Sequence, residues 1–122
     1  MIYIFSAFYA EAKNIIDHYG LKKEKSPEMV RFDVFANDSI RLVITGVGEI
    51  NAAAAVSNIG GAYGISPDDE ILNVGCGAGF SSDICLGSIF LGNKLTEQMT
   101  GRTFYPCLLY TSPSPRDRSL SR

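Results

Sequence analysis

The sequence predicts an α/β fold with a mixed central sheet. Two segments with helical periodicity alternate with short apolar segments, which is typical of helices packed on a buried sheet. Two of the apolar segments adjoin as a hairpin, so part of the sheet is expected to be antiparallel. Two strands end in glycine-rich turns, where α/β proteins commonly bind a ligand. We therefore expect a three-layer sandwich in the order β-α-β-β-α-β-β.

The chain begins with a predicted strand and a predicted helix. Ile2–Ala7 is apolar almost throughout, which indicates a strand buried on both of its faces. Tyr9–Tyr19 carries apolar residues at helical spacing, and Gly20 suits the left-handed position that ends many helices. Lys22–Glu28 is charged and is expected to connect this helix to the next strand.

The predicted hairpin and a second helix follow. Met29–Ala36 and Ser39–Thr45 are expected to be strands joined at Asn37-Asp38, a pair that tolerates the left-handed conformation of tight hairpins. Asn51–Tyr63 is expected to be a helix, and its run Ala52–Ala55 is small enough to pack closely on a sheet.

Two further strands are expected after the second helix. Glu70–Val74 is short and apolar, which indicates a buried strand. Gly87–Gly92 is expected to be another strand, and it leads into the polar segment Asn93–Arg102.

The composition is that of a globular protein with no strong charge. Hydrophobic residues make up 46% of the 122 residues, charged residues make up 20%, and the net charge is −2. This balance does not favour binding to nucleic acid or to a membrane surface. The three cysteines, Cys76, Cys85 and Cys107, form no CxxC pair, so we expect neither a disulfide framework nor a metal site. The cysteines are consistent with a reducing, cytoplasmic setting, and no cofactor is expected.

The last sixteen residues, 107–122, differ from the rest. They have no hydrophobic periodicity after Tyr110, which predicts a disordered tail, and a Ser-Pro/Arg linker open to phosphorylation is an alternative. The run from Cys107 to Asp117 also resembles the translation of a sequencing adapter. On that interpretation residues 1–106 are the native part of this chain, the N-terminal half of a domain. The natural protein would then continue after Pro106 with residues other than 107–122.

The first glycine turn, Gly46-Val47-Gly48, leads into the second predicted helix. A GxG turn at a helix N-terminus suits a phosphate or another anion. A dinucleotide-binding fingerprint requires a third glycine, and this chain has Asn51 there. A tight strand-to-helix turn without a ligand is an equally good interpretation of these glycines.

Three other residues are candidates for chemistry or binding. Glu11 opens the first helix, where an acid complements the helix dipole. If a pocket lies beside the first strand, this carboxylate could instead hold or deprotonate a water. Cys76 lies between Gly75 and Gly77 in the second glycine turn, but a reactive thiol needs an activating base and none is evident. Phe8 suits the core or the stacking of an aromatic ring on a base or sugar.

Taken together, these segments resemble the nucleoside phosphorylase and nucleosidase superfamily, and most of all its methylthioadenosine/S-adenosylhomocysteine nucleosidases. Ile4–Glu11 is similar to the opening strand and acidic helix start of that family. Thr45–Ala53 is similar to its second glycine turn and alanine-rich helix. Asn73–Gly79, followed by Leu86–Ile89, is similar to the family signature and the Gly-Asp-Ile strand after it.

The resemblance implies an open α/β sandwich, phosphorylase/hydrolase-like, whose enzyme cleaves the N-glycosidic bond of a purine nucleoside by hydrolysis. A glutamate matching Glu11 positions the attacking water and stabilises the oxocarbenium-like transition state. The residue matching Cys76 is usually serine and lines the water and ribose site together with the neighbouring Gly77, while Phe8 matches a methionine beside the ribose. Gly46 and Gly48 would line the same site, and the full-length protein would be a homodimer.

Two other functions remain open. Phosphate-dependent phosphorylases of the superfamily carry an arginine where this chain has Asn73 and a glycine near Glu11, so hydrolysis is favoured over phosphorolysis. A non-catalytic nucleoside-binding or assembly module is the alternative from another class. The family's ribose-binding Met-Glu segment and its leaving-group aspartate have no counterpart here, so we expect this truncated chain to be inactive.

Overall fold

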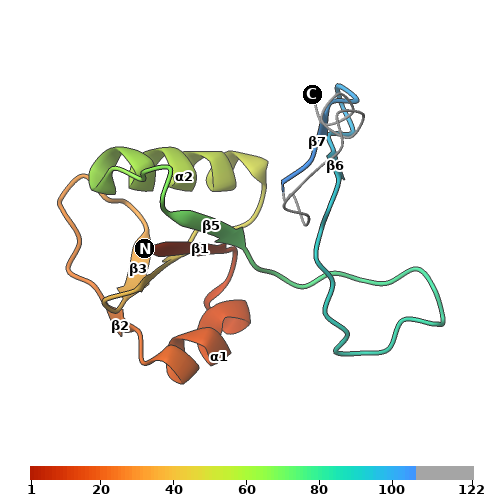
Figure 1. Ribbon diagram of the computed structural model, residues 1–122, viewed down its shortest axis with the longest axis horizontal. Coiled ribbons are helices and arrows are strands. Elements are labelled where there is room, and N and C mark those ends of the chain that lie inside the picture. The colour runs from red at the N-terminus through yellow and green to blue at the C-terminus, as the bar shows by residue number, and fades with distance from the viewer. Residues whose placement is uncertain (107–122) are drawn as a thin grey trace. The chain divides into compact units, whose positions relative to one another are not determined.

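The computed structural model describes residues 1–106 of the chain. The chain divides into two units, Met1–Ala78 and a unit that begins at Gly79, and each is described by itself. The predicted tail over 107–122 lies outside the described residues. Met1–Ala78 is an α/β unit with a five-stranded mixed sheet and two helices (Figure 1). Its elements are β1 (Ile2–Ser6), α1 (Tyr9–Tyr19), β2 (Lys22–Lys23), β3 (Asp33–Ala36), β4 (Ile40–Ile44), α2 (Glu49–Tyr63) and β5 (Glu70–Asn73).

The sheet has the strand order β2-β3-β4-β1-β5. β1 is the middle strand of the parallel part and pairs in parallel with β4 on one side and with β5 on the other. β3 pairs antiparallel with β4, and β2 with β3, so the hairpin half of the sheet is antiparallel. The carboxyl ends of β4, β1 and β5 therefore lie at one edge of the sheet.

The two helices cover opposite faces of this sheet (Figure 1). Helix α1 is confirmed at the predicted bounds and ends at Gly20, which has φ of 62°. The N–H groups of Gly20 and Leu21 donate back to the carbonyls of Asp17 and Ile16 in the last turn. Helix α2 begins at Glu49, two residues before the predicted start, because the chain leaves its extended conformation at Gly48. Gly64, with φ of 69°, ends it.

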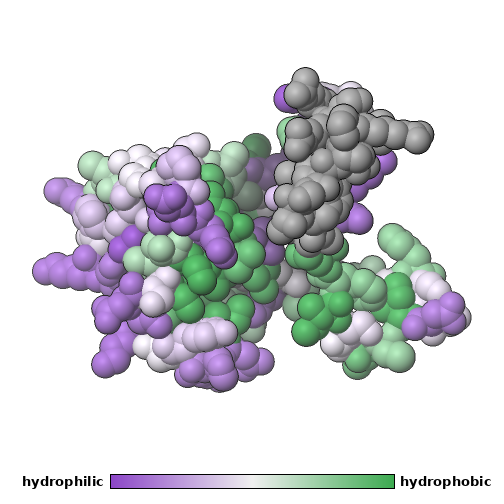
Figure 2. Space-filling model, viewed as in Figure 1, coloured by the Kyte–Doolittle hydropathy of each residue, from purple (hydrophilic) through white to green (hydrophobic). Residues whose placement is uncertain are grey.

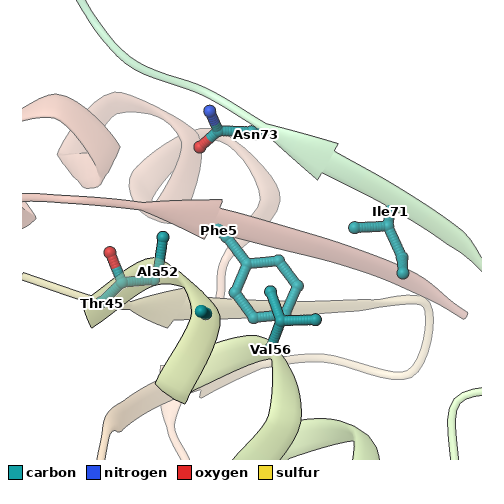
Figure 3. A pocket seen from close by; sticks show the side chains of 7 residues that line it. Phe5, Thr45, Ala52, Val56, Ile71 and Asn73 are labelled. Atoms are coloured by element: carbon teal, nitrogen blue, oxygen red, sulfur yellow. The ribbon is translucent and has the colours of Figure 1, made fainter. Parts of the chain in front are cut away.

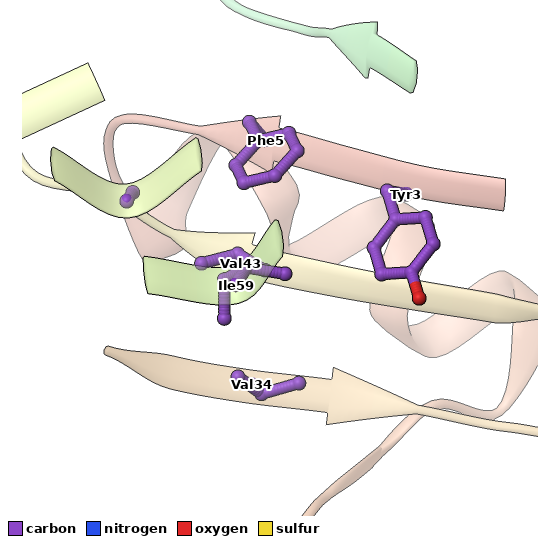
Figure 4. Close-up of a cluster of buried hydrophobic side chains, with 6 residues drawn as sticks. Tyr3, Phe5, Val34, Val43 and Ile59 are labelled. Carbon is purple, nitrogen blue, oxygen red and sulfur yellow. The ribbon is translucent and has the colours of Figure 1, made fainter. Parts of the chain in front are cut away.

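A hydrophobic core lies on each face of the sheet. On the α2 face, Tyr3, Phe5, Val34 and Val43 from the strands pack against Ile59 of the helix (Figure 4). On the α1 face, Ile4, Ile40 and Leu42 pack against Ala12 and Ile16. The alternation along β1 explains this division, because successive side chains of a strand point to opposite faces. Because both faces of the sheet are covered, β1 and β4 are almost wholly apolar, with Arg41 the charged residue of β4.

The hairpin differs from the prediction in two respects, and the connection before it in one. β3 begins only at Asp33, because Val30 and Phe32 pack against the α2-side core without pairing in the sheet. The connection is not left-handed, since no residue other than glycine has positive φ in the described chain. Instead, Asn37 Oδ1 accepts the N–H groups of Ser39 and Ile40, each at 2.8 Å. The predicted Lys22–Glu28 connection includes the short strand β2.

The second unit contains little regular structure over residues 79–106. Its strands β6 (Leu95–Thr96) and β7 (Thr103–Phe104) form a two-stranded antiparallel ribbon inside and just after the predicted polar segment. The predicted strand Gly87–Gly92 is wrong, because this apolar segment has no neighbouring strand with which to share backbone hydrogen bonds. Neither helix of residues 1–106 combines the length and the apolar character needed to cross a membrane.

Candidate functional site

The carboxyl edge of β4, β1 and β5 is the natural place for a site in Met1–Ala78. The chain leaves β1 toward α1 on one face, whereas it leaves the neighbouring β4 toward α2 on the other face. Such a divergence between adjacent parallel strands opens a crevice in which α/β proteins bind ligands. Here the backbone ladder continues past the strand ends, with Thr45 N–H donating to Ser6 O at 2.8 Å and Gly46 N–H to Ala7 O at 3.1 Å.

Glu11 lies at this edge, on the α1 side of β1. It occupies the third position of α1, where a glutamate often caps the helix, but the helix start has no side-chain cap. Its Oε1 accepts the Cys76 N–H at 3.4 Å, and its Oε2 accepts the Ser6 hydroxyl at 3.5 Å. Both bonds are long, and a carboxylate has further lone pairs, so Glu11 retains the capacity to bind a water or a ligand hydroxyl.

The structure brings Glu11 and Cys76 together, as a shared pocket requires. It is the backbone N–H of Cys76 that contacts Glu11, while the thiol is exposed and free. Gly77 follows in the same irregular segment and has open space around it. Phe8 caps the N-terminus of α1 with an extended backbone, and its side chain is about half exposed, at 52%.

Gly46 and Gly48 lie at the end of β4 and form the turn into α2. Both have positive φ, 83° and 98°, which explains why glycine is present at each position. A β-carbon added at Gly46 would lie 3.2 Å from Asn51 Nδ2, which itself donates to Val47 O at 2.7 Å. Asn51 stands where a dinucleotide fingerprint has its third glycine. Its side-chain amide therefore stabilises the turn through a hydrogen bond to the turn's own backbone.

A groove opens on the α2 face of the sheet and has a volume of about 390 Å³ (Figure 3). Thr45 and Asn73 stand at the carboxyl edge, and the rest of the lining is apolar and comes from β1, α2 and β5. The full lining is Phe5, Thr45, Ala52, Ala53, Val56, Ile71 and Asn73. Glu11 does not line this groove, so the predicted catalytic residue and the groove lie on different faces of the sheet.

Two residues at the edge were missed by the sequence interpretation. Ser6 is fully buried and is the polar end of an otherwise apolar strand, a signal that could have identified it. Gly75 lies beside the carboxylate, and a β-carbon there would lie 3.6 Å from Glu11 Oε2, which is an ordinary contact distance. Within residues 1–106, no group of three or more His, Cys, Asp or Glu side chains is placed to hold a metal ion.

Comparisons of the chain with protein-family models, with curated proteins and with solved structures find no match. The candidate site is therefore interpreted from its own residues and from the resemblance of its motifs.

Proposed function

We propose that this chain carries the water-binding half of a purine nucleosidase site, in a fold of the three-layer phosphorylase type. The observation that supports the proposal most is the position of Glu11. Its carboxylate lies at the carboxyl edge, next to the buried Ser6 hydroxyl and the Cys76 N–H. A carboxylate held in this way orients a water as a general base and stabilises a developing oxocarbenium charge.

Hydrolysis fits this edge better than phosphorolysis. A phosphate dianion needs cationic side chains or several backbone donors. Glu11 presents negative charge at this edge, and Asn73 offers only a neutral amide. Arg41, the arginine of the sheet, lies near the amino end of β4 and is paired with Glu24. A phosphate beside Glu11 would therefore be repelled and unsupported.

The function of Glu11 is tested in the natural full-length protein, whose sequence is first read from its coding DNA. Reading that DNA beyond the codon for Pro106 is the first step, and we expect a frame that adds a Met-Glu pair and a later aspartate. Glu11→Gln in that protein should lower adenine release from 5′-methylthioadenosine about 100-fold or more while binding is retained. Glu49→Gln is the matched control, because Glu49 also lies in the first turn of a helix.

Four outcomes would contradict the proposal. If Thr111–Arg122 and a stop codon are genuine, the chain is better explained as a binding module. If adenine release depends on phosphate, the protein is a phosphorylase. If Glu11→Gln and Glu49→Gln have the same activity, Glu11 has no catalytic role. The 122-residue chain itself should release no adenine, and release in proportion to its concentration would show that it is already complete.

A further inference from the structure

Ser6 is a polar residue in the most apolar part of the fold. It is the last residue of β1, and its side chain is fully buried. The sheet around it is apolar, and hydrophobic surface is visible over the adjacent β5, between the two helices (Figure 2). Successive side chains of a strand point to opposite faces, so Ser6 lies with Ile4 on the α1 face, whereas Phe5 lies on the α2 face.

Packing alone does not account for a hydroxyl at this position. Alanine has nearly the same volume, and a buried hydroxyl costs free energy unless it is hydrogen-bonded. Within residues 1–106 the bond that this hydroxyl makes is to Glu11, whose Oε2 accepts it at 3.5 Å. The Ser6 carbonyl accepts the Thr45 N–H at 2.8 Å, so the strand end that carries the hydroxyl is itself fixed in the sheet.

The two carboxylate oxygens of Glu11 are contacted from two different parts of the fold. Oε2 accepts the Ser6 hydroxyl from β1, and Oε1 accepts the Cys76 N–H from the segment after β5. The last torsion of a glutamate side chain has only a broad preference of its own. Donors to both oxygens restrict this rotation, which one donor alone leaves free. The contacts of a catalytic carboxylate are often long without substrate and tighten when it binds.

We propose that Ser6 is a positioning residue, which acts on the reaction only through Glu11. This role rests on the proposed function, in which Glu11 orients the attacking water. The Ser6 hydroxyl holds Oε2, so the lone pairs that Glu11 shares with neither Ser6 nor Cys76 are directed at the water. Without the hydroxyl the carboxylate rotates and the water is misplaced. Misplacement of a general base lowers turnover and leaves substrate affinity unchanged.

The interaction itself is tested by urea denaturation of the 122-residue chain, which requires no activity. Ser6→Ala, Glu11→Ala and the double variant form a double-mutant cycle. If the two side chains interact, the combined effect on the unfolding equilibrium constant should differ from the product of the single effects by about twofold or more.

The positioning role is tested by kinetics in the natural full-length protein. Ser6→Ala should lower kcat for adenine release about tenfold and leave KM unchanged. Ser6→Thr keeps the hydroxyl and should retain most of the turnover. In a Glu11→Gln background, Ser6→Ala should change kcat by less than about twofold, because the carboxylate through which Ser6 acts is already absent. This comparison decides the question even where the extra methyl group of threonine disrupts folding.

Ser26→Ala is the matched control for Ser6→Ala. The Ser26 hydroxyl oxygen is also buried, but it lies in the connection from β2 to β3, and β3 and β4 separate β2 from β1. Its removal should leave both kcat and KM at the wild-type values.

Failure of this role and failure of the proposed function give different results. If Glu11→Gln has wild-type activity, the proposed function is wrong and the role of Ser6 falls with it. If Glu11→Gln is impaired but Ser6→Ala turns over like the wild type, only the role of Ser6 is overturned. Equal losses of kcat from Ser6→Ala with and without the Glu11 carboxylate, or independent effects in urea, would also overturn it, because Ser6 would then contribute to folding alone.

Discussion

Gly46 is the residue where backbone conformation most directly limits substitution. Its φ is 83°, and an added β-carbon would lie 3.2 Å from Asn51 Nδ2. We predict that Gly46→Ala lowers the free energy of unfolding by about 1–3 kcal/mol, because both the backbone and the Asn51 amide must shift. Urea denaturation measures this change.

Gly61→Ala is the matched control for Gly46→Ala. Gly61 lies in α2, its φ is not positive, and an added β-carbon there would meet nothing within 4 Å. Alanine should therefore stabilise the helix by about 0.5–1 kcal/mol. Equal effects of the two substitutions, in sign and size, would show that the turn at Gly46 is not constrained as described.

Asp69 gives the fold a predictable response to acid. Its Oδ2 accepts the Ser66 N–H at 2.9 Å and its Oδ1 lies 3.2 Å from the amino group of Met1. The Ser66 backbone N–H, with the Met1 amino group adding to it, lowers the Asp69 pKa below its ordinary 3.8. When a carboxyl group has a lower pKa in the folded state than in the unfolded state, its ionised form stabilises the fold. This contribution is fully present at a pH above the unfolded-state pKa and is lost as the pH falls through the folded-state pKa.

The variant Asp69→Asn should therefore be less stable than the wild type at neutral pH, and the difference should vanish in acid. Urea denaturation from neutral pH to below 3.8 measures that difference. Asp68→Asn removes one charge from the same turn and serves as the control. A gap between Asp69→Asn and the wild type that persists in strong acid would mean that the carboxylate charge contributes nothing.

At the candidate site, sequence alone identified the ionisable residue but not its partners. Glu11 was found because its position after a buried strand is local information. Ser6 contacts it across the short connection from β1 to α1, five residues away. The Cys76 N–H contacts it only because β1 and β5 pair in register, across 65 residues of sequence. The proximity of Gly75 to Glu11 likewise arises from the fold, since the two residues belong to different elements.

At the scale of elements, one polar cluster joins the end of α2 to the segment after β2. Tyr63 donates its hydroxyl to Glu24 Oε2 at 2.7 Å, and Arg41 lies between them, 3.4 Å from the same oxygen and with its guanidinium carbon 3.8 Å from the centre of the Tyr63 ring. Tyr63→Phe keeps the ring and removes the hydroxyl. We predict a loss of about 1 kcal/mol in unfolding free energy, the usual net value of one hydrogen bond.

The same cluster responds to base. Burial raises the pKa of Tyr63 above 10.0, with Glu24 adding to the shift. When a hydroxyl group has a higher pKa in the folded state than in the unfolded state, its protonated form stabilises the fold. This contribution is fully present at a pH below the unfolded-state pKa and is lost as the pH rises through the folded-state pKa. The advantage of the wild type over Tyr63→Phe should therefore shrink above pH 10.0, as chemical denaturation can measure. Tyr19→Phe, at an exposed position on α1, is the control, and the same loss there would contradict a specific role for Tyr63.

Elements with a strong internal pattern were predicted well, and elements defined by their neighbours were not. The bounds of α1 follow from apolar spacing and Gly20, both of which are local. β2 has only two lysines, and pairing with β3 makes it a strand. Gly87–Gly92 has the apolar character of a strand but no partner in the described chain. Strand identity depends on hydrogen bonds between segments, and composition does not reveal them.

At the scale of the molecule, the α/β class was predictable because helical periodicity marks the two helices and short apolar runs between them mark the buried strands. The division at Ala78 was not. Both sides of it contain apolar residues, but those before it are shared between two cores, whereas Phe80, Leu86 and Ile89 are almost wholly exposed. Apolar content alone does not indicate whether a segment has a surface to pack against.

This contrast predicts where a protease cuts first. Chymotrypsin cleaves after large apolar and aromatic residues and needs a locally extended chain. Within Met1–Pro106 we expect the first cuts after Phe80, Leu86 or Phe90, which lie outside regular structure and are at least 70% exposed. Mass spectrometry should then show a fragment that begins at Met1 and ends at one of these residues.

Two tyrosines of α1 provide the internal control for this experiment. Tyr9 and Tyr19 are about half exposed, at 47% and 52%, so their surfaces are open to the enzyme, but their backbone is helical. Cleavage at either one requires α1 to detach from the core formed by Ala12 and Ile16, and it should be slower. Early cleavage after Tyr9 or Tyr19 would mean that α1 is not held on the sheet, and the contacts of Glu11 with Ser6 and Cys76 would then not persist in solution.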